Sequence, residues 1–232
     1  MVQQARLNDA AIALHRVLSG QQVKFGIFGG YAVSTLGGPR ESKDVDCIAS
    51  VNKQQILNIL DGKNGFVAVP QLRQDYVAFL WSDKPSRERA VLVEIFCEGF
   101  PGATFTMADV VPRAAQVTGE TQGTGATMLL DPVYLFKGKL RAAATRGKFH
   151  DASDLRWLES NYLSRLQQNR GQLSLLYVGL ALKRYPELQH CFTRIGVNIQ
   201  AAIARAAAHD INHLPPPQPG DVQKGLLAPP NT

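Results

Sequence analysis

The amino-acid sequence predicts an α+β fold, in which a mixed β-sheet is flanked by helices and followed by a helical segment. Up to about residue 130, apolar runs with the period of strands alternate with stretches that have the period of amphipathic helices. From residue 131 to about residue 208, the pattern is helical only. With 232 residues, of which 45% are hydrophobic, the chain is long enough to bury an ordinary core.

We expect three regions, which are an α/β core over 1–130, a helical segment over 131–208 that closes one side of a cleft, and a tail over 209–232. The tail is rich in proline and is expected to be disordered or extended. The net charge of +6 favours polyanionic partners such as nucleotides or RNA. No apolar run reaches the ~18 residues of a membrane helix, and the three cysteines lack metal-like spacing. We therefore expect a cytoplasmic protein without a membrane partner.

Turn signals and apolar periodicity place the elements of the core. Gly20 ends a first helix, and Gly29-Gly30 interrupt the chain between a strand and a short helix. Further strands follow, with a charged loop over 83–89 between two of them. The expected helices of the core are 7–18, 31–36 and 52–60, and the expected strands are 23–28, 44–50, 66–69, 76–81, 89–96 and one strand with loops within 116–130.

A clear helix start marks the second region. Asp131-Pro132 combines an N-cap residue with proline at the first helical position. This helix is expected to run to about Arg146, and a second one covers about 149–162. Two or three more helices are expected within 172–208.

The stretch from Phe25 to Ser50 carries the strongest chemical signal. Asp44 and Asp46 lie two apart in a predicted strand, so their side chains face the same way. Two neighbouring carboxylates in an apolar strand are costly unless a cation lies between them, and oxygen ligands suit Mg²⁺ or Mn²⁺. Upstream, the Gly29-Gly30 turn opens a helix, where backbone N–H groups can approach a phosphate.

The order of these residues resembles a known signature. Gly-Gly, a short helix, and then Arg40-x-Ser42-x-Asp-hydrophobic-Asp resembles the polymerase-beta-like nucleotidyltransferase superfamily. Within it, the chain looks most like minimal nucleotidyltransferases and abortive-infection type nucleotidyltransferase toxins. The resemblance implies a nucleotidyltransferase-like fold and metal-dependent transfer of a nucleoside monophosphate from an NTP, such as ATP, to an acceptor. That acceptor could be RNA, a protein or a small molecule.

The resemblance also implies which residues form the site. Asp44 and Asp46 would bind the metal, and the superfamily carries a third acidic residue on a later strand. Glu94 matches that position by context, and Glu98 is the alternative. Taken alone, Glu94 is either a functional carboxylate or an edge-strand residue in contact with solvent. The NTP contacts would come from Gly29, Gly30, Ser34, Arg40 and Ser42, although the Ser34 hydroxyl could instead bond its own helix backbone.

A second part of the resemblance lies in the helix that starts at Asp131. Lys139 and Arg146 are seven residues apart on one edge of this helix, and we expect them to contact the triphosphate. The alternative is that they are solvated surface charges. Lys137 and Arg141 are placed on the opposite edge. Downstream, Asp151 and Asp154 are expected to be a helix N-cap and salt-bridge partners rather than metal ligands.

Two other classes of function stay open at this point. The chain could be a non-catalytic module that binds a nucleotide or a partner. Alternatively, the fold could act on a small molecule without phosphate, because a fold does not fix a function.

Overall fold

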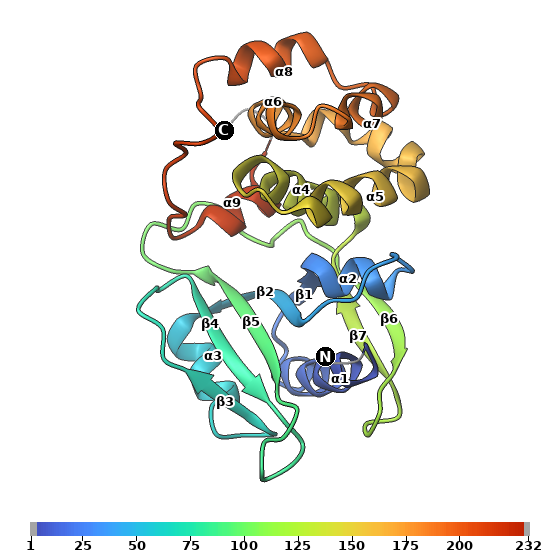
Figure 1. Cartoon of the computed structure of the whole chain (residues 1–232). Coiled ribbons are helices and arrows are strands. Elements are labelled where there is room, and N and C mark those ends of the chain that lie inside the picture. Colours follow the sequence, from blue (N-terminus) through green and yellow to red (C-terminus); the bar gives the residue numbers. More distant parts are fainter. Residues whose placement is uncertain (1–3, 230–232) are drawn as a thin grey trace. The chain divides into compact units, whose positions relative to one another are not determined.

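The computed structural model describes residues 4–229, and the chain folds into two compact units that divide between Asp131 and Pro132 (Figure 1). The first unit contains a β-sheet with helices, and the second is helical. This is the α+β class that the sequence predicts. The expected closure of a cleft by the helical segment stays a prediction.

The first unit is built on one mixed sheet with the strand order β3-β4-β5-β2-β1-β7-β6. The two central parallel pairings are β2 with β5 and β1 with β7, and the other neighbours are antiparallel. The strands are β1 (Phe25–Phe28), β2 (Asp44–Asn52), β3 (Phe66–Val69), β4 (Tyr76–Trp81), β5 (Val91–Gly99), β6 (Arg113–Thr118) and β7 (Thr124–Leu129).

Three helices accompany this sheet, namely α1 (Gln4–Gly20), α2 (Gly29–Thr35) and α3 (Lys53–Leu60). The long helix α1 contacts strands β2, β5, β6 and β7 and buries Leu7, Leu14 and Leu18 completely. Helix α3 begins with a capping box. The Asn52 side chain accepts from the Gln55 backbone N–H, and the Gln55 side-chain oxygen accepts from the Asn52 backbone N–H. The elements expected at the start of the chain are therefore present, with ends that differ by a few residues.

The region 113–129 differs from expectation, because it forms a hairpin of two strands rather than one strand with loops. Strand β6 shows one buried residue, Val117, so it has almost no apolar pattern that a sequence reading could detect. Its turn is fixed from a distant part of the chain. The buried Asp9 carboxylate in α1 accepts the backbone N–H groups of Thr121 and Gln122 at 3.0 and 2.7 Å.

The second unit packs its helices around a small apolar core. Ala144, Leu180 and Ala206 pack together there, and the rings of Phe136 and Phe192 meet edge to face. Within residues 4–229, no helix combines the length and apolarity that crossing a bilayer requires. The helices are α4 (Pro132–Thr145), α5 (Phe149–Gln168), a short 3-10 turn (Arg170–Gln172), α6 (Leu175–Arg184), α7 (Leu188–Ile195), α8 (Ile199–Ala206) and α9 (Asp221–Leu227).

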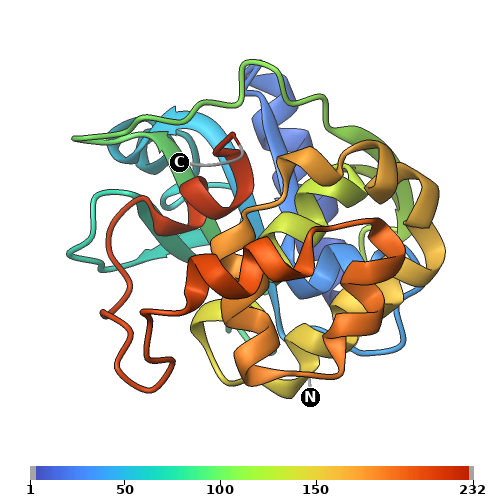
Figure 2. The ribbon, with the colours of Figure 1, turned by 90° about the horizontal axis from the view of Figure 1, so that it is seen from above.

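Helix α9 lies in the tail, which the sequence predicts to be disordered or extended. From α8 the chain passes through an irregular, proline-rich loop and ends in α9, drawn red in Figure 2. Helix α9 packs against α4, and its Leu226 side chain is fully buried. Burial of that apolar side chain explains why a short, weakly helical segment is ordered here. Residues 230–232 of the expected tail lie outside the described part of the chain.

Candidate active site

The three predicted carboxylates lie on neighbouring strands of the central sheet. Asp46 of β2 and Glu94 of β5 are direct partners in the parallel register, and Asp44 precedes Asp46 by two residues. Val45 and Val93, which alternate with them, are fully buried, whereas the three acidic residues are partly exposed. Since alternate residues of a strand point to opposite faces, the carboxylates share the face that Val45 and Val93 do not use.

The register favours Glu94 over Glu98 as the third carboxylate. Glu98 lies four residues further along β5, and its carboxylate accepts from the Ser50 hydroxyl at 2.7 Å and the Met107 backbone N–H at 2.8 Å. These bonds tie the end of β5 to β2 and to the following loop. Glu98 thus has a structural function that does not require a ligand.

Gly29 brings the start of α2 close to the Asp46 carboxylate. Its φ is +72°, a left-handed conformation that L side chains rarely adopt. A Cβ atom built on Gly29 would lie 2.1 Å from Asp46 Oδ2. The preceding Phe28 is the direct partner of Asp46 in the antiparallel β1–β2 register, which explains the close approach. Only glycine fits at this position while Asp46 keeps its place.

Gly30 is surrounded in a similar way by Arg40 and Ser42. A Cβ atom on Gly30 would lie 2.7 Å from Arg40 Nη2 and 2.8 Å from Ser42 Oγ. Ser42 is buried, and its hydroxyl donates to the Asp44 carbonyl and Oδ1 oxygens, each at 3.2 Å. The loop before β2 therefore folds back onto the start of α2, so the predicted glycines, Arg40, Ser42 and the aspartates form one cluster.

Ser34 makes a contact that neither expectation included. Its hydroxyl donates to Gln4 Oε1 of α1 at 2.9 Å, so it bonds another helix rather than its own backbone. The next residue, Thr35, does bond its own helix, through the Tyr31 carbonyl at 2.9 Å. A nucleotide contact from Ser34 stays a prediction.

In the second unit, Lys139 is held by two acidic residues of α5. Its Nζ atom lies 2.7 Å from Asp154 Oδ2 and 3.6 Å from Asp151 Oδ1, and the lysine is only 4% exposed. Lys139 is therefore not a solvated surface charge. The prediction of Asp151 and Asp154 as salt-bridge partners is confirmed, but Asp151 lies in the first turn of α5, whose N-cap is Lys148.

Arg146 belongs to the same ion-pair network. Its guanidinium meets Asp151 in a bidentate arrangement, with Nε–Oδ2 at 2.8 Å and Nη2–Oδ1 at 3.0 Å. Burial alone would raise the pKa of Asp151. The hydrogen bonds and charge of Arg146, together with the charges of Lys139 and His150, outweigh burial and hold that pKa below its ordinary value. Contact of Lys139 and Arg146 with a triphosphate stays a prediction.

Lys137, which the sequence places with Arg141 on the opposite edge of α4 from Lys139, is buried rather than a solvated surface charge. The Lys137 side chain is 6% exposed, and its Nζ donates to the Ala228 carbonyl at 2.9 Å. The C-terminal segment around α9 covers it. The burial of Lys137 does not follow from the sequence, because the segment that covers it is expected to be disordered or extended. The adjacent Gly138, where a Cβ would lie 2.9 Å from Leu226, is a signal of a close helix contact.

The residue types on β2 and β5 fit a divalent cation, but their side chains do not converge on one point as metal ligands would. Carboxylate oxygens are the ligands that Mg²⁺ and Mn²⁺ prefer. Among residues 4–229, no three His, Cys, Asp or Glu side chains are arranged as a metal site. Asp46 lies against Gly29, and Asp44 is engaged by Ser42. The backbone register thus brings the carboxylates together, whereas a shared ion would require their side chains to converge.

Comparison with known proteins supports the fold. No protein-family model matches the chain, and no curated protein sequence does. Among solved structures, an antigenic nucleotidyltransferase-like protein from Paracoccidioides brasiliensis matches with a TM-score of 0.55 and 18% identity over 82% of this chain and 93% of that chain. The lincomycin-bound lincosamide antibiotic adenylyltransferase LnuA matches with a TM-score of 0.41 and 11% identity, over 62% and 91%. The chain therefore has a nucleotidyltransferase-like fold.

Proposed function

We propose that this protein is a metal-dependent nucleotidyltransferase that moves a nucleoside monophosphate from an NTP to an acceptor. The observation that carries this proposal is the direct pairing of Asp46 with Glu94 beside Gly29, whose missing side chain lets the start of α2 reach the Asp46 carboxylate.

In the proposed reaction, an acceptor hydroxyl or phosphate attacks the α-phosphorus in line, and pyrophosphate leaves. Asp44, Asp46 and Glu94 would hold Mg²⁺ or Mn²⁺, which when bound offsets the negative charge of the phosphates and makes the acceptor more acidic. Glu94 would accept the proton of the attacking group. The backbone N–H groups at Gly29 and Gly30 would bind the triphosphate, because neither residue has a side chain that would keep the phosphate at a distance.

Several other residues would orient these groups. Ser42 fixes Asp44 through its hydroxyl, and Arg40 lies against Gly30, where a phosphate would arrive. We also propose Ser34 as a contact from α2. In the second unit, the Asp151 and Asp154 carboxylates hold the cations of Lys139 and Arg146 in defined positions, as a phosphate-binding pair would need.

The test measures transfer of a labelled nucleoside monophosphate from an NTP to an acceptor. Each of the four α-labelled NTPs is incubated with the protein, Mg²⁺ or Mn²⁺, and a cell extract as the source of acceptor. We expect one labelled product that disappears with Asp46→Asn, which keeps the size of the side chain and removes its charge. Asp61→Asn is the matched control, because Asp61 lies in the same unit but accepts from the Ala68 backbone N–H on the surface.

Two results would argue against the proposal. Label transfer that persists in Asp46→Asn would place the chemistry elsewhere. Metal-dependent NTP binding without any product, across all four nucleotides and extracts, would instead support a binding module that lacks catalysis.

A further inference from the structure

A second set of cationic and polar groups lies within the helical unit and takes no part in the proposed transfer. Lys137 of α4 is as buried as Lys139, two residues further on, but the two lysines have different partners. Lys139 pairs with two carboxylates. Among the described residues, Lys137 contacts the Ala228 carbonyl and the Tyr134 ring, whose centroid lies 5.5 Å from Nζ. Its ammonium group therefore has no carboxylate to balance it in this part of the chain.

An ammonium group in such a place is costly, because burial removes water and a carbonyl does not carry a full opposite charge. Burial lowers the pKa of Lys137 to about 8. Replacing the lysine by an apolar residue would remove this penalty, as it often does for buried charges. A role that requires the charge would explain why the position is a lysine.

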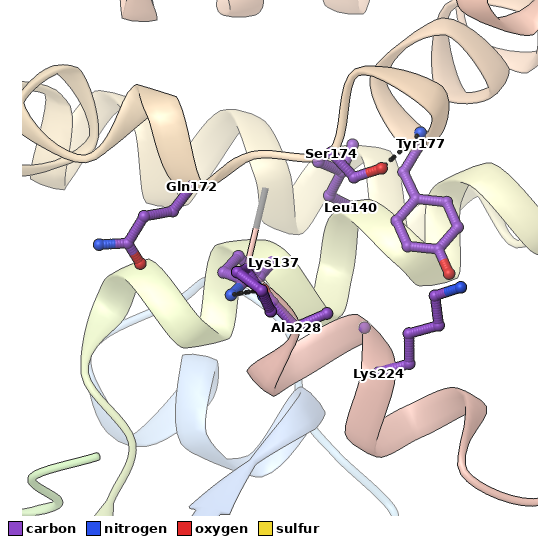
Figure 3. Close-up of a pocket in the computed structure, with 9 residues that line it drawn as sticks. Lys137, Leu140, Gln172, Ser174, Tyr177, Lys224 and Ala228 are labelled. Carbon is purple, nitrogen blue, oxygen red and sulfur yellow. Dashed lines mark hydrogen bonds between the residues drawn. The ribbon is translucent and has the colours of Figure 1, made fainter. Parts of the chain in front are cut away.

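The groups around Lys137 are suited to an oxyanion. Figure 3 shows Lys137, Gln172, Ser174, Tyr177 and Lys224 around one small cavity. Two ammonium groups, a phenol, a serine hydroxyl and a side-chain amide are all able to donate hydrogen bonds. Among the residues that the structure describes, none that lines this cavity is acidic. The nearby Asp221 carboxylate lies 3.6 Å from the Arg141 guanidinium.

The C-terminal segment forms one side of this cavity, through Lys224, Gly225, Ala228 and Pro229. With the segment in place, the cavity has a volume of about 20 Å³, which is room for a single water molecule. The Ala228 carbonyl oxygen occupies the position in front of the Lys137 ammonium. The cover fits closely, because Leu226 lies over Gly138, where an added Cβ would come within 2.9 Å of it.

The cover is a short segment that packs on α4. Helix α9 has seven residues, and a helix of that length is not stable by itself in water. It is anchored by Leu226, by the Asp221–Arg141 pair and by the Lys137 bond to Ala228. Such short segments belong to the parts of a protein that open most easily.

We propose that Lys137 is the centre of a covered phosphate site, in which a phosphate oxygen replaces the Ala228 carbonyl when the segment 221–229 moves away. Phosphate is favoured over a carboxylate because four donor side chains outside the moving segment line the cavity, and they suit the several oxygens of a phosphate; these are Lys137, Gln172, Ser174 and Tyr177. The site lies wholly within the helical unit. It shares no residue with the carboxylate cluster of the sheet, so the proposal does not depend on the proposed transfer reaction.

The test uses inorganic phosphate as the probe with the full-length protein, at constant ionic strength. We expect saturable 1:1 binding by isothermal titration. In Lys137→Gln, the affinity should fall at least tenfold, which corresponds to about 1.4 kcal/mol for one charge-assisted contact. This variant keeps an N–H donor for the Ala228 carbonyl, so it removes the charge while retaining the bond to the cover.

Lys183→Gln is the matched control. Lys183 lies in the same unit and also donates to carbonyls, those of Ala207 and His209, but it is exposed and outside the cavity. Its phosphate affinity should equal that of the wild type. Hydrogen exchange gives a local readout, because phosphate should accelerate exchange of the amides in α9 if the cover leaves.

Three outcomes would overturn the proposal. The first is the absence of phosphate binding to the wild type. The second is equal binding by wild type and Lys137→Gln, which would indicate an anion site elsewhere, including the proposed triphosphate seat. The third is binding without faster exchange in α9, which would leave the cover in place and make Lys137 only an anchor for the C-terminal segment.

Discussion

Replacing Gly29 by alanine tests whether the glycine turn positions the Asp46 carboxylate. The new Cβ would lie 2.1 Å from Asp46 Oδ2, whereas Cβ contacts under 3.0 Å essentially never occur. The oxygen therefore has to move by about 0.9 Å. Displacements of ~1 Å at reacting groups reduce catalysis on the order of a hundredfold. In addition, a φ of +72° costs alanine about 1–2 kcal/mol of stability.

The two effects can be separated with Gly62→Ala. Gly62 has nearly the same φ, +70°, but an added Cβ there meets no atom within 4 Å. Both variants should therefore lose a similar 1–2 kcal/mol, which lowers the melting temperature by about 2–8 °C. Only Gly29→Ala should also lose about a hundredfold in the rate of label transfer.

The assays are thermal unfolding and single-turnover label transfer, run on both variants. A melting temperature that falls equally in both, with transfer intact in Gly29→Ala, would refute the coupling between Gly29 and Asp46. Loss of transfer in Gly62→Ala would show that backbone strain alone disturbs the unit, and the comparison would no longer support a site at Asp46.

Two further predictions concern Glu94 and Lys137. Glu94→Gln should reduce label transfer at least a hundredfold with little change in stability. Glu98→Gln should keep label transfer and lose about 1 kcal/mol of stability, because it weakens the hydrogen bond from the Met107 N–H. The reverse result would exchange the roles of the two residues. Lys137→Met should be compared with wild type by urea unfolding from pH 7 to pH 10. The folded pKa of about 8 lies below the ordinary 10.5, so the unfolded chain binds more protons between these values and wild-type stability rises with pH there. The burial penalty of about 3 kcal/mol at pH 7 should fall by about 2.5 kcal/mol at pH 10, and a difference between the two proteins that is independent of pH would contradict the shift.

The glycines and aspartates of the candidate site could be predicted because they lie close together in the sequence. Gly29, Gly30, Asp44 and Asp46 lie within one β-α-β stretch, where glycine spacing and strand alternation fix which groups face together. The choice between Glu94 and Glu98 was different. Both follow apolar strand positions, and only the pairing of β5 with β2 shows that Glu94 is level with Asp46. Register between distant strands depends on packing, which the local pattern does not contain.

Strand β6 was hidden for a related reason. Its side chains are mostly exposed, so the apolar alternation that marks a strand is missing. What holds the hairpin is the carboxylate of Asp9, which lies 112 residues from Thr121 in the chain. An aspartate inside a predicted helix gives no sign that it will bind the backbone of a remote turn.

The contrast between Lys137 and Lys139 shows the same limit within a single helix. Helical periodicity placed them on opposite edges of α4, but it does not determine which of these edges is buried. Which edge meets water depends on what packs there. Helix α5 brings two carboxylates to Lys139, whereas α9 brings a backbone carbonyl to Lys137. Since a short helix such as α9 is ordered by its contacts rather than by its own propensity, the environment of Lys137 follows from tertiary packing alone. That no carboxylate within residues 4–229 opposes the buried Lys137 is therefore a feature that the folded unit reveals and the sequence does not.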